Sequence, residues 1–333
     1  MTARITTIDA HTAGEPLRVI TRGLPEIPGE TILERRRWAE ENLESLRRAL
    51  MLEPRGHADM YGCILMPPAT SDGDLGVLFL HNEGYSTMCG HGIIGLVKVG
   101  VEEGLFELDP EDPRVRIDTP AGRVTATAHL EEERVARVSF ENVPSFLLHR
   151  DVVVETPTLG EVRFDIGYGG AFYAYVDANS LGLELTPSSF ARIVSMGKEI
   201  KQAVSEAVEL VHPAGEDDLN FLYGTIFVGP AEGSAHSRNV CVFADGEVDR
   251  SPTGTGVSGR AAVHHARGEL GLGERITIES ILGTSFDVEL IGTREVGALE
   301  GVIPRVTGSA HITGRHEFEI SPEDPLAAGF LLR

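Results

Sequence analysis

One stretch decides the fold predicted for this chain: Thr87-Met88-Cys89-Gly90-His91-Gly92-Ile93-Ile94-Gly95. An apolar strand pattern ends just before it, and an apolar helix pattern begins within it. The same glycine spacing returns 164 residues later, in Pro252-Thr253-Gly254-Thr255-Gly256-Val257-Ser258-Gly259. The second copy has threonine where the first has cysteine. The prediction of both fold and function depends on this pair of stretches and on that single difference.

The elements expected around the two stretches repeat in the same order. Each half has strands, a long amphipathic helix, more strands, a turn, the glycine stretch and a buried helix. The two amphipathic helices are predicted at Thr31–Leu52 and Pro187–Glu209. We therefore expect an N-terminal half over residues 1–130, to which residues from about 320 to 333 return, and a C-terminal half over 131–319. If the halves face each other, the two helix starts meet at one cleft.

Composition limits the class of protein. A chain of 333 residues suits two domains. The 29 Lys and Arg against 51 Asp and Glu give a net charge of −22, which argues against nucleic acid or an anionic membrane as partner. Three cysteines without a C-x-x-C pair favour a reducing cytosol over a disulfide framework or a zinc site. The chain shows no signal-peptide pattern and no apolar run of the ~20 residues that a membrane span needs, so a cytoplasmic location is expected.

Both stretches match G-x-G-x-x-G, the dinucleotide-binding fingerprint. In that motif the first glycine follows its strand almost directly. Here about nine residues, including a turn, separate Leu80 from Gly90. Neither copy lies in a convincing strand–helix–strand crossover. The sequence therefore argues against nicotinamide binding, and no cofactor is expected.

A simpler reading is that the glycine-rich helix starts bind an anion. Glycines there leave backbone N–H groups accessible, and the helix dipole favours negative charge. Ser251 followed by Pro252 resembles an N-cap and a first helical residue. Close helix packing is the alternative role for the glycines. At the first start, the Cys89 thiol lies where its pKa can be lowered, and it can act as nucleophile or base. Cys63 and Cys241, within apolar strands, are expected to be core residues.

At this point the residues resemble a known family. Residues 88–92 and 249–256 are similar to the two signatures of the proline racemase family, and three other stretches agree: Ile8-Asp9-Ala10-His11-Thr12-Ala13-Gly14-Glu15-Pro16, Pro54-Arg55-Gly56-His57-Ala58-Asp59-Met60-Tyr61-Gly62 and Gly169-Gly170-Ala171-Phe172-Tyr173-Ala174. The resemblance implies an α/β fold of the α+β type, like diaminopimelate epimerase. Two pseudo-symmetric halves would each wrap a mainly antiparallel sheet around a central helix. It also implies catalysis without cofactor or metal.

The resemblance also implies a reaction. Racemases and epimerases of this family have a cysteine in both signatures, one on each face of the substrate's α-carbon. Thr253 departs from that pattern, because a threonine hydroxyl is too weak an acid–base group to replace a thiol. The Cys/Thr combination resembles the trans-3-hydroxy-L-proline dehydratases of the family, which form pyrroline-2-carboxylate. In that substrate the hydroxyl and the α-hydrogen lie on the same ring face, so a syn elimination needs a base on one face only.

The resemblance assigns roles position by position. Cys89 would take the α-proton, and Thr253 would hold the opposite ring face. The carboxylate would be bound by Gly90, His91, Gly254 and Thr255. Asp249 would pair with the ring ammonium. Tyr61 and Phe243 would form apolar walls.

Several alternatives stay open. A proline racemase or hydroxyproline 2-epimerase could use water as the second acid, and a protein that binds an amino acid without catalysis could retain the same residues. Diaminopimelate epimerase fits less well, because its signature has asparagine at position 91 and cysteine at position 253. The expected partner is a small hydroxyproline-like imino acid, with a homodimer as the assembly considered. Metal binding by His236, His264 and His265 is disfavoured. His11 and His57 receive no role beyond structural hydrogen bonding.

Overall fold

The computed structural model describes residues 2–109, 111–213, 215 and 217–332. Contacts divide the chain into two compact units. Unit 1 comprises Met1–Phe140 and Ser309–Arg333, and unit 2 comprises Glu141–Gly308. This division falls about ten residues after the expected boundary at 130/131 and about ten before the one at 319/320. The acidic run at 131–133 is instead a hairpin turn inside unit 1, where Glu132 and Glu133 have φ of 48° and 66°.

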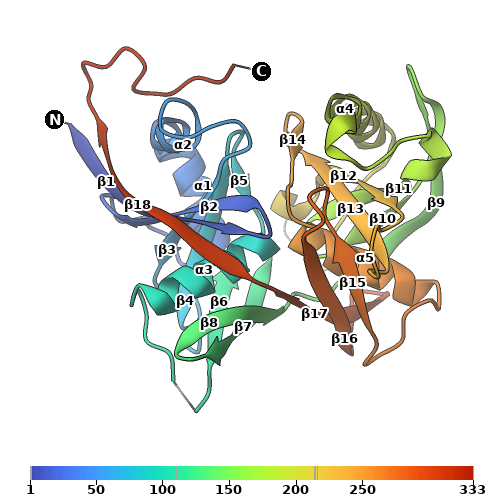
Figure 1. The fold of residues 1–333 in the computed structure, drawn as a ribbon, viewed down its shortest axis with the longest axis horizontal. Coiled ribbons are helices and arrows are strands. Elements are labelled where there is room, and N and C mark those ends of the chain that lie inside the picture. Colours follow the sequence, from blue (N-terminus) through green and yellow to red (C-terminus); the bar gives the residue numbers. More distant parts are fainter. Residues whose placement is uncertain (1, 110, 214, 216, 333) are drawn as a thin grey trace. The chain divides into compact units, whose positions relative to one another are not determined.

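Unit 1 contains nine strands and three α-helices among its described residues. They are β1 (Ala3–Thr12), β2 (Glu15–Arg22), β3 (Tyr61–Met66), β4 (Leu75–His81), β5 (Tyr85–Ser86), β6 (Arg114–Thr119), β7 (Gly122–Glu131), β8 (Arg134–Glu141), β18 (Ala310–Ile320), α1 (Ile32–Asn42), α2 (Glu44–Met51) and α3 (Gly90–Glu102). Strand β18 lies antiparallel beside β1, although the two come from opposite ends of the chain (Figure 1).

Helix α3 forms the centre of unit 1. It contacts β1, β2, β3, β7 and β18, and its residues from Gly90 to Gly100 are all buried. This agrees with the prediction of a helix that is apolar nearly all round. Helices α1 and α2 pack on strand β4, where Leu78 and Leu80 join their apolar cluster. Because side chains alternate across a strand, Phe79 points to the other side and meets the first turn of α3.

The single helix predicted over Thr31–Leu52 is two helices. Helix α1 starts as the Thr31 side chain accepts a hydrogen bond from the Glu34 amide and Glu34 bonds back, which makes a capping box. The chain leaves helical geometry at Leu43, with φ −114° and ψ 10°. The break lets Leu43 join Leu50 and Met51 in the same buried cluster. Tertiary packing has overridden a continuous helical pattern.

Unit 2 repeats this plan among its described residues. Its elements are β9 (Phe146–Thr156), β10 (Gly160–Tyr168), β11 (Phe172–Asp177), β12 (Leu222–Gly229), β13 (Ser237–Phe243), β14 (Glu247–Val248), β15 (Arg275–Glu279), β16 (Ser285–Val296), β17 (Leu299–Gly308), α4 (Phe190–Ala207) and α5 (Gly254–Ala266), with short 3₁₀ turns η1 (Ala178–Leu181), η2 (Pro187–Ser189) and η3 (Asp217–Leu219). Helix α5 contacts β9, β10, β11, β16 and β17, and α4 packs on β12 and β13.

The pairing of strands is the same in both units. In unit 1 the pairs are β1–β2 antiparallel, β2–β3 parallel, β3–β4 antiparallel, β4–β5 antiparallel, β4–β6 parallel and β6–β7 antiparallel. In unit 2 the series is β10–β11, β11–β12, β12–β13, β13–β14, β13–β15 and β15–β16, with the same directions. The internal repeat read from the glycine stretches is therefore a repeat of topology. The predicted class, an α/β fold of mainly antiparallel sheet around a central helix in each half, is confirmed. No helix in the described residues is both long enough and apolar enough to cross a membrane.

Candidate active site

Cys89 is the N-cap residue of α3. Its backbone is extended, with φ −142° and ψ 108°, and its Sγ accepts a hydrogen bond from the Gly92 amide over 3.2 Å. An amide donor and the positive end of a helix dipole both stabilise a thiolate. Cys63 in β3 and Cys241 in β13 are fully buried in strands, as predicted. Burial raises the pKa of the Cys63 thiol, which is therefore unsuited to act as a base.

His91 lies directly beside the Cys89 thiol. Its Nδ1 is 3.2 Å and its Nε2 3.7 Å from Sγ. The Thr12 hydroxyl donates to the His91 carbonyl over 2.8 Å. The Tyr61 ring meets the imidazole edge-on, at a centroid distance of 4.7 Å and an angle of 73°, and its hydroxyl is hydrogen-bonded to Ser86. Tyr61 was expected to form an apolar wall. In the structure its ring packs against His91, which the sequence did not predict.

The helix start in unit 2 has a different geometry. Thr253 is the N-cap of α5 with φ 69° and ψ 98°, and its side chain makes no capping hydrogen bond. A β-branched residue at positive φ is strained, and such strain concentrates at functional sites. Within the described part of the chain, the buried Thr253 hydroxyl has no hydrogen-bond partner. The prediction of Ser251 as N-cap and Pro252 as first helical residue is wrong, because α5 begins at Gly254.

Ser251 instead orders the loop before α5. Its Oγ accepts from the Thr253 amide over 3.1 Å. Its own amide donates to Asp249 Oδ1 over 2.7 Å, and Asp249 is buried. These two hydrogen bonds therefore fix the position of the Asp249 carboxylate in the loop that leads into α5. Phe243, at the end of β13, is buried and stacked on Tyr223 with ring centroids 5.3 Å apart.

Two tyrosines of β11 hold the first turn of α5. Tyr173 Oη lies 2.6 Å from Thr255 Oγ1, and Tyr175 donates to the Gly256 carbonyl over 2.8 Å. Burial raises the pKa of both phenols well above 10, so each stays protonated and able to donate. A Tyr173 hydroxyl that donates to Thr255 leaves the Thr255 proton available for another acceptor. Sequence reasoning missed both tyrosines, although Tyr173 lies within one of the family-like stretches.

Close packing explains most of the glycines in the two stretches. A Cβ on Gly92 would come within 2.4 Å of the Phe79 ring, and one on Gly256 within 2.4 Å of Ile226. Corresponding contacts at Gly95 and Gly259 are 2.7 Å and 2.4 Å. The packing role considered as the alternative is thus real for these four positions. It does not compete with anion binding, which depends on the amides of the first turn.

The predicted site residues fall into two groups, one in each unit. Unit 1 brings together Tyr61, Cys89, Gly90 and His91, and unit 2 brings together Asp249, Thr253, Gly254 and Thr255. Among the described residues, no cluster of three or more His, Cys, Asp or Glu side chains is suited to hold a metal ion. His11 accepts a hydrogen bond from the Gly14 amide over 3.2 Å, which is the structural role suggested for it.

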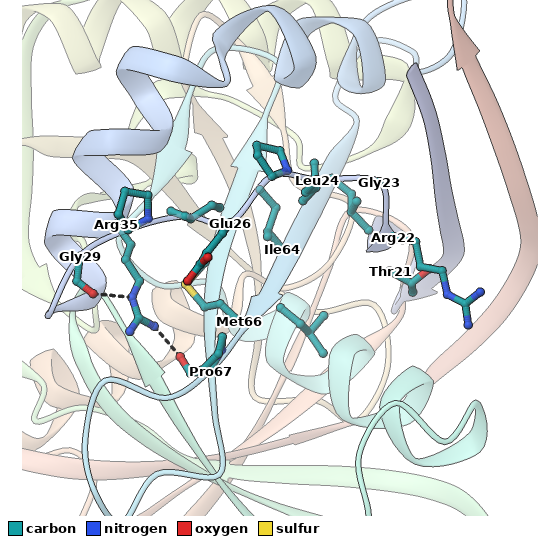
Figure 2. Close-up of a pocket in the computed structure, with 15 residues that line it drawn as sticks. Thr21, Arg22, Gly23, Leu24, Glu26, Gly29, Arg35, Ile64, Met66 and Pro67 are labelled. Carbon is teal, nitrogen blue, oxygen red and sulfur yellow. Dashed lines mark hydrogen bonds between the residues drawn. The ribbon is translucent and has the colours of Figure 1, made fainter. Parts of the chain in front are cut away.

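Unit 1 also has a pocket of about 370 Å³ that is separate from Cys89 (Figure 2). It is lined by residues 20–29, Arg35 and residues 64–67, and Arg35 spans it with hydrogen bonds to the carbonyls of Gly29 and Pro67. None of Tyr61, Cys89 and His91 lines it.

The chain belongs to the proline racemase family, whose model matches residues 7–331. It is 50% identical over 330 residues to a trans-3-hydroxy-L-proline dehydratase from Colwellia psychrerythraea, covering 99% of this chain and 93% of the relative. It is also 50% identical over 328 residues to a protein of the same name from Bacillus cereus, with 98% of both chains covered. A relative from Burkholderia multivorans named 3-hydroxyproline 2-epimerase is 46% identical, covering 99% of this chain and 98% of the relative.

A solved structure agrees over nearly the whole chain. It is a hydroxyproline epimerase from Agrobacterium vitis with bound trans-4-hydroxy-L-proline, which superposes with a TM-score of 0.91 at 32% identity. The match covers 99% of this chain and 96% of the epimerase.

Proposed function

We propose that the protein dehydrates trans-3-hydroxy-L-proline to pyrroline-2-carboxylate without a cofactor. The observation that carries the proposal is the pairing of cysteine at one helix start with threonine at the other. Cys89 has an amide donor and an imidazole on its sulfur, whereas Thr253 has a hydroxyl that cannot serve as a base at neutral pH. The dehydratase name of relatives at 50% identity supports the same reading.

The proposal gives each of the two groups of residues a role in the reaction. The Cys89 thiolate removes the α-proton, and the charge that develops on the carboxylate is stabilised by the first-turn amides at Gly90, His91 and Gly254 and by the Thr255 hydroxyl. Asp249 pairs with the ring ammonium. The Thr253 hydroxyl meets the opposite ring face, with Phe243 as an apolar wall. Loss of water gives an enamine, which tautomerises to pyrroline-2-carboxylate.

A direct assay tests the reaction. The protein is incubated with trans-3-hydroxy-L-proline, trans-4-hydroxy-L-proline and L-proline in D₂O. Formation of pyrroline from the first substrate alone is the expected result. Inverted amino acid carrying α-deuterium would instead identify a racemase or epimerase, the function that the Burkholderia multivorans relative's name suggests.

The variant Cys89→Ser tests the base. Its hydroxyl is a far weaker acid than a thiol, so dehydration should fall by about 10³-fold or more. Cys63→Ala is the matched control, because Cys63 is fully buried in β3 and is not among the predicted site residues. Full activity in Cys89→Ser would show that the catalytic base is elsewhere. No turnover by the unaltered protein, combined with substrate binding, would favour an amino-acid-binding protein.

We further propose that the protein works in the reducing cytosol, where the Cys89 thiol stays reduced, and that it assembles as a homodimer. Sedimentation velocity at micromolar concentration checks the assembly, and a monomer would contradict it. Fractionation of the source cells checks the location.

A further inference from the structure

The proposed dehydration needs an acid as well as a base. Hydroxide is a poor leaving group, so a proton must reach the departing 3-hydroxyl oxygen as the C–O bond breaks. In a syn elimination this acid must act on the ring face from which the α-proton is taken. The acid must therefore be a group beside Cys89.

His91 satisfies that requirement by position. Both its ring nitrogens lie within 3.7 Å of Cys89 Sγ, the nearer at 3.2 Å. The edge-on ring of Tyr61 packs against the imidazole, and the Thr12 hydroxyl fixes the His91 backbone through its carbonyl. Tyr61 is itself fixed by its hydrogen bond to Ser86 and by stacking on His81 at 5.6 Å. These contacts restrict the ring to the side of the thiol.

We propose that His91 is the general acid of the dehydration and that Cys89 and His91 rest as a thiolate–imidazolium pair. This inference rests on the proposed function. It assigns the group that protonates the leaving 3-hydroxyl, a role that the proposed function leaves open. The Gly92 amide, which donates to Sγ over 3.2 Å, supports the thiolate form. An imidazolium carries a proton on each ring nitrogen, so it can donate one to the sulfur and transfer the other to the substrate.

The steps balance. The thiolate takes the α-proton and becomes S–H, and the electron pair of the broken C–H bond forms the double bond between the α- and β-carbons. The C–O bond to the 3-hydroxyl breaks, and the imidazolium gives its proton to that oxygen, which leaves as water. The site then holds S–H and neutral imidazole. Nε2, the nitrogen that gave up its proton, lies 3.7 Å from Sγ, and transfer of the thiol proton to it, directly or through the released water, restores the pair without any net proton from solvent.

An alternative is that the imidazole only binds the carboxylate, which is the role that the family resemblance implies. The two roles differ in one respect. If the imidazole only binds the carboxylate, its removal should slow the reaction by the same factor whatever group leaves. If it is a general acid, its removal should slow the reaction only when the leaving group needs a proton. Fluoride leaves without one, and fluorine is close in size to hydroxyl.

The experiment compares kcat/KM of the unaltered protein and His91→Gln on trans-3-hydroxy-L-proline and trans-3-fluoro-L-proline. The general-acid role predicts that the variant loses about 10²–10⁴-fold on the hydroxyl substrate and at least about 30-fold less on the fluoro substrate. Any change in the thiolate fraction affects both substrates and cancels in the ratio. Losses that agree within about threefold would overturn the proposal. His149→Gln, on strand β9, is the control and should retain both activities.

A second measurement needs no turnover and tests the resting ion pair directly, even if the fluoro substrate is inert or the variant does not fold. Iodoacetamide alkylates thiolates, so its rate reports the charge on Cys89. A resting ion pair keeps the rate at pH 6 within about tenfold of that at pH 9, whereas an isolated thiol of pKa ~8.5 loses about 240-fold. Cys89→Ser provides the blank. An ordinary thiol profile in the unaltered protein would overturn the pair.

Failure of the function and failure of this inference give different results. If the unaltered protein releases no pyrroline from trans-3-hydroxy-L-proline, the function itself is wrong. If it does so, and His91→Gln loses both substrates equally, only the role of His91 is wrong.

Discussion

The Gly92 amide donates a hydrogen bond to Cys89 Sγ over 3.2 Å, so the residue that caps the helix is also the candidate base. At the corresponding position of unit 2, the Thr253 side chain makes no such bond to its own helix, and its φ is positive. The two helix starts therefore differ in backbone as well as in side chain. The start of α3 stabilises an anionic sulfur on Cys89. At the start of α5, the buried Thr253 hydroxyl does not cap its helix and is available for a different contact.

Gly92→Ala should disturb both packing and the thiol. Its Cβ would lie 2.4 Å from Phe79 and 2.9 Å from Cys89 Sγ. Overpacking of this kind costs about 1–3 kcal/mol of unfolding free energy, measured by urea denaturation. We also expect slower alkylation of Cys89. Gly84→Ala is the control, because nothing lies within 4 Å of a Cβ there. Equal stability of both variants would contradict the packing argument.

Tyr173→Phe should raise KM for the substrate and leave kcat nearly unchanged. The change removes the partner 2.6 Å from the Thr255 hydroxyl and leaves that hydroxyl free to rotate. Loss of one hydrogen bond costs about 1 kcal/mol, so KM should rise roughly fivefold with kcat nearly unchanged. Tyr175→Phe is the comparison, since Tyr175 bonds the Gly256 backbone and should affect stability instead. A fall in kcat alone in Tyr173→Phe would refute the positioning role of Tyr173.

Thr253→Cys should add slow inversion of the α-carbon to the dehydration. A thiol on the second face can return a proton there, which the Thr253 hydroxyl cannot. Inversion should be slower than dehydration, because the positive φ at this residue gives the side chain no capping bond to its helix. The measurement is α-deuterium in inverted L-proline recovered from D₂O. Absence of any inversion would mean that the second face lacks more than a thiol.

Stability should fall as the pH drops below about 6.5. Burial lowers the pKa of His212, whose ring contacts Phe146, Tyr168 and Phe172. Its folded pKa lies below the unfolded value, so protons bind the unfolded chain first, and the stability present above pH 6.5 is lost as the pH falls through the folded pKa. Urea midpoints at pH 7.5, 6.5 and 5.5 measure this.

His212→Asn should flatten that slope in part. The rest of the slope belongs to other histidines whose pKa burial also lowers: His11, His236 and His264. For His236 and His264, the nearby Arg260 guanidinium adds to the lowering. A slope that is unchanged in His212→Asn would show that His212 titrates normally.

Local pattern was sufficient for much of this molecule. Apolar alternation and turn residues located the strands, and the nearly continuous apolar pattern after Gly92 predicted a helix buried on most sides. The repeated glycine spacing predicted the repeated topology, because Gly92 and Gly256 each let the first turn of a helix pack closely on a strand side chain, Phe79 and Ile226. The family signatures supplied the candidate residues, since they are contiguous in sequence.

Only the tertiary structure shows which residues far apart in the sequence are in contact. The break at Leu43 exists because one core accepts side chains from both helices, and no local signal marks it. The bonds from Thr12 to His91 and from Tyr173 to Thr255 join residues 79 and 82 positions apart. The sequence predicted Ser251 as the N-cap, but the N-cap of α5 is Thr253, whose φ is positive. Residue identity thus determined which groups could do chemistry, while packing determined which of them touch, because contact depends on chain path rather than on composition.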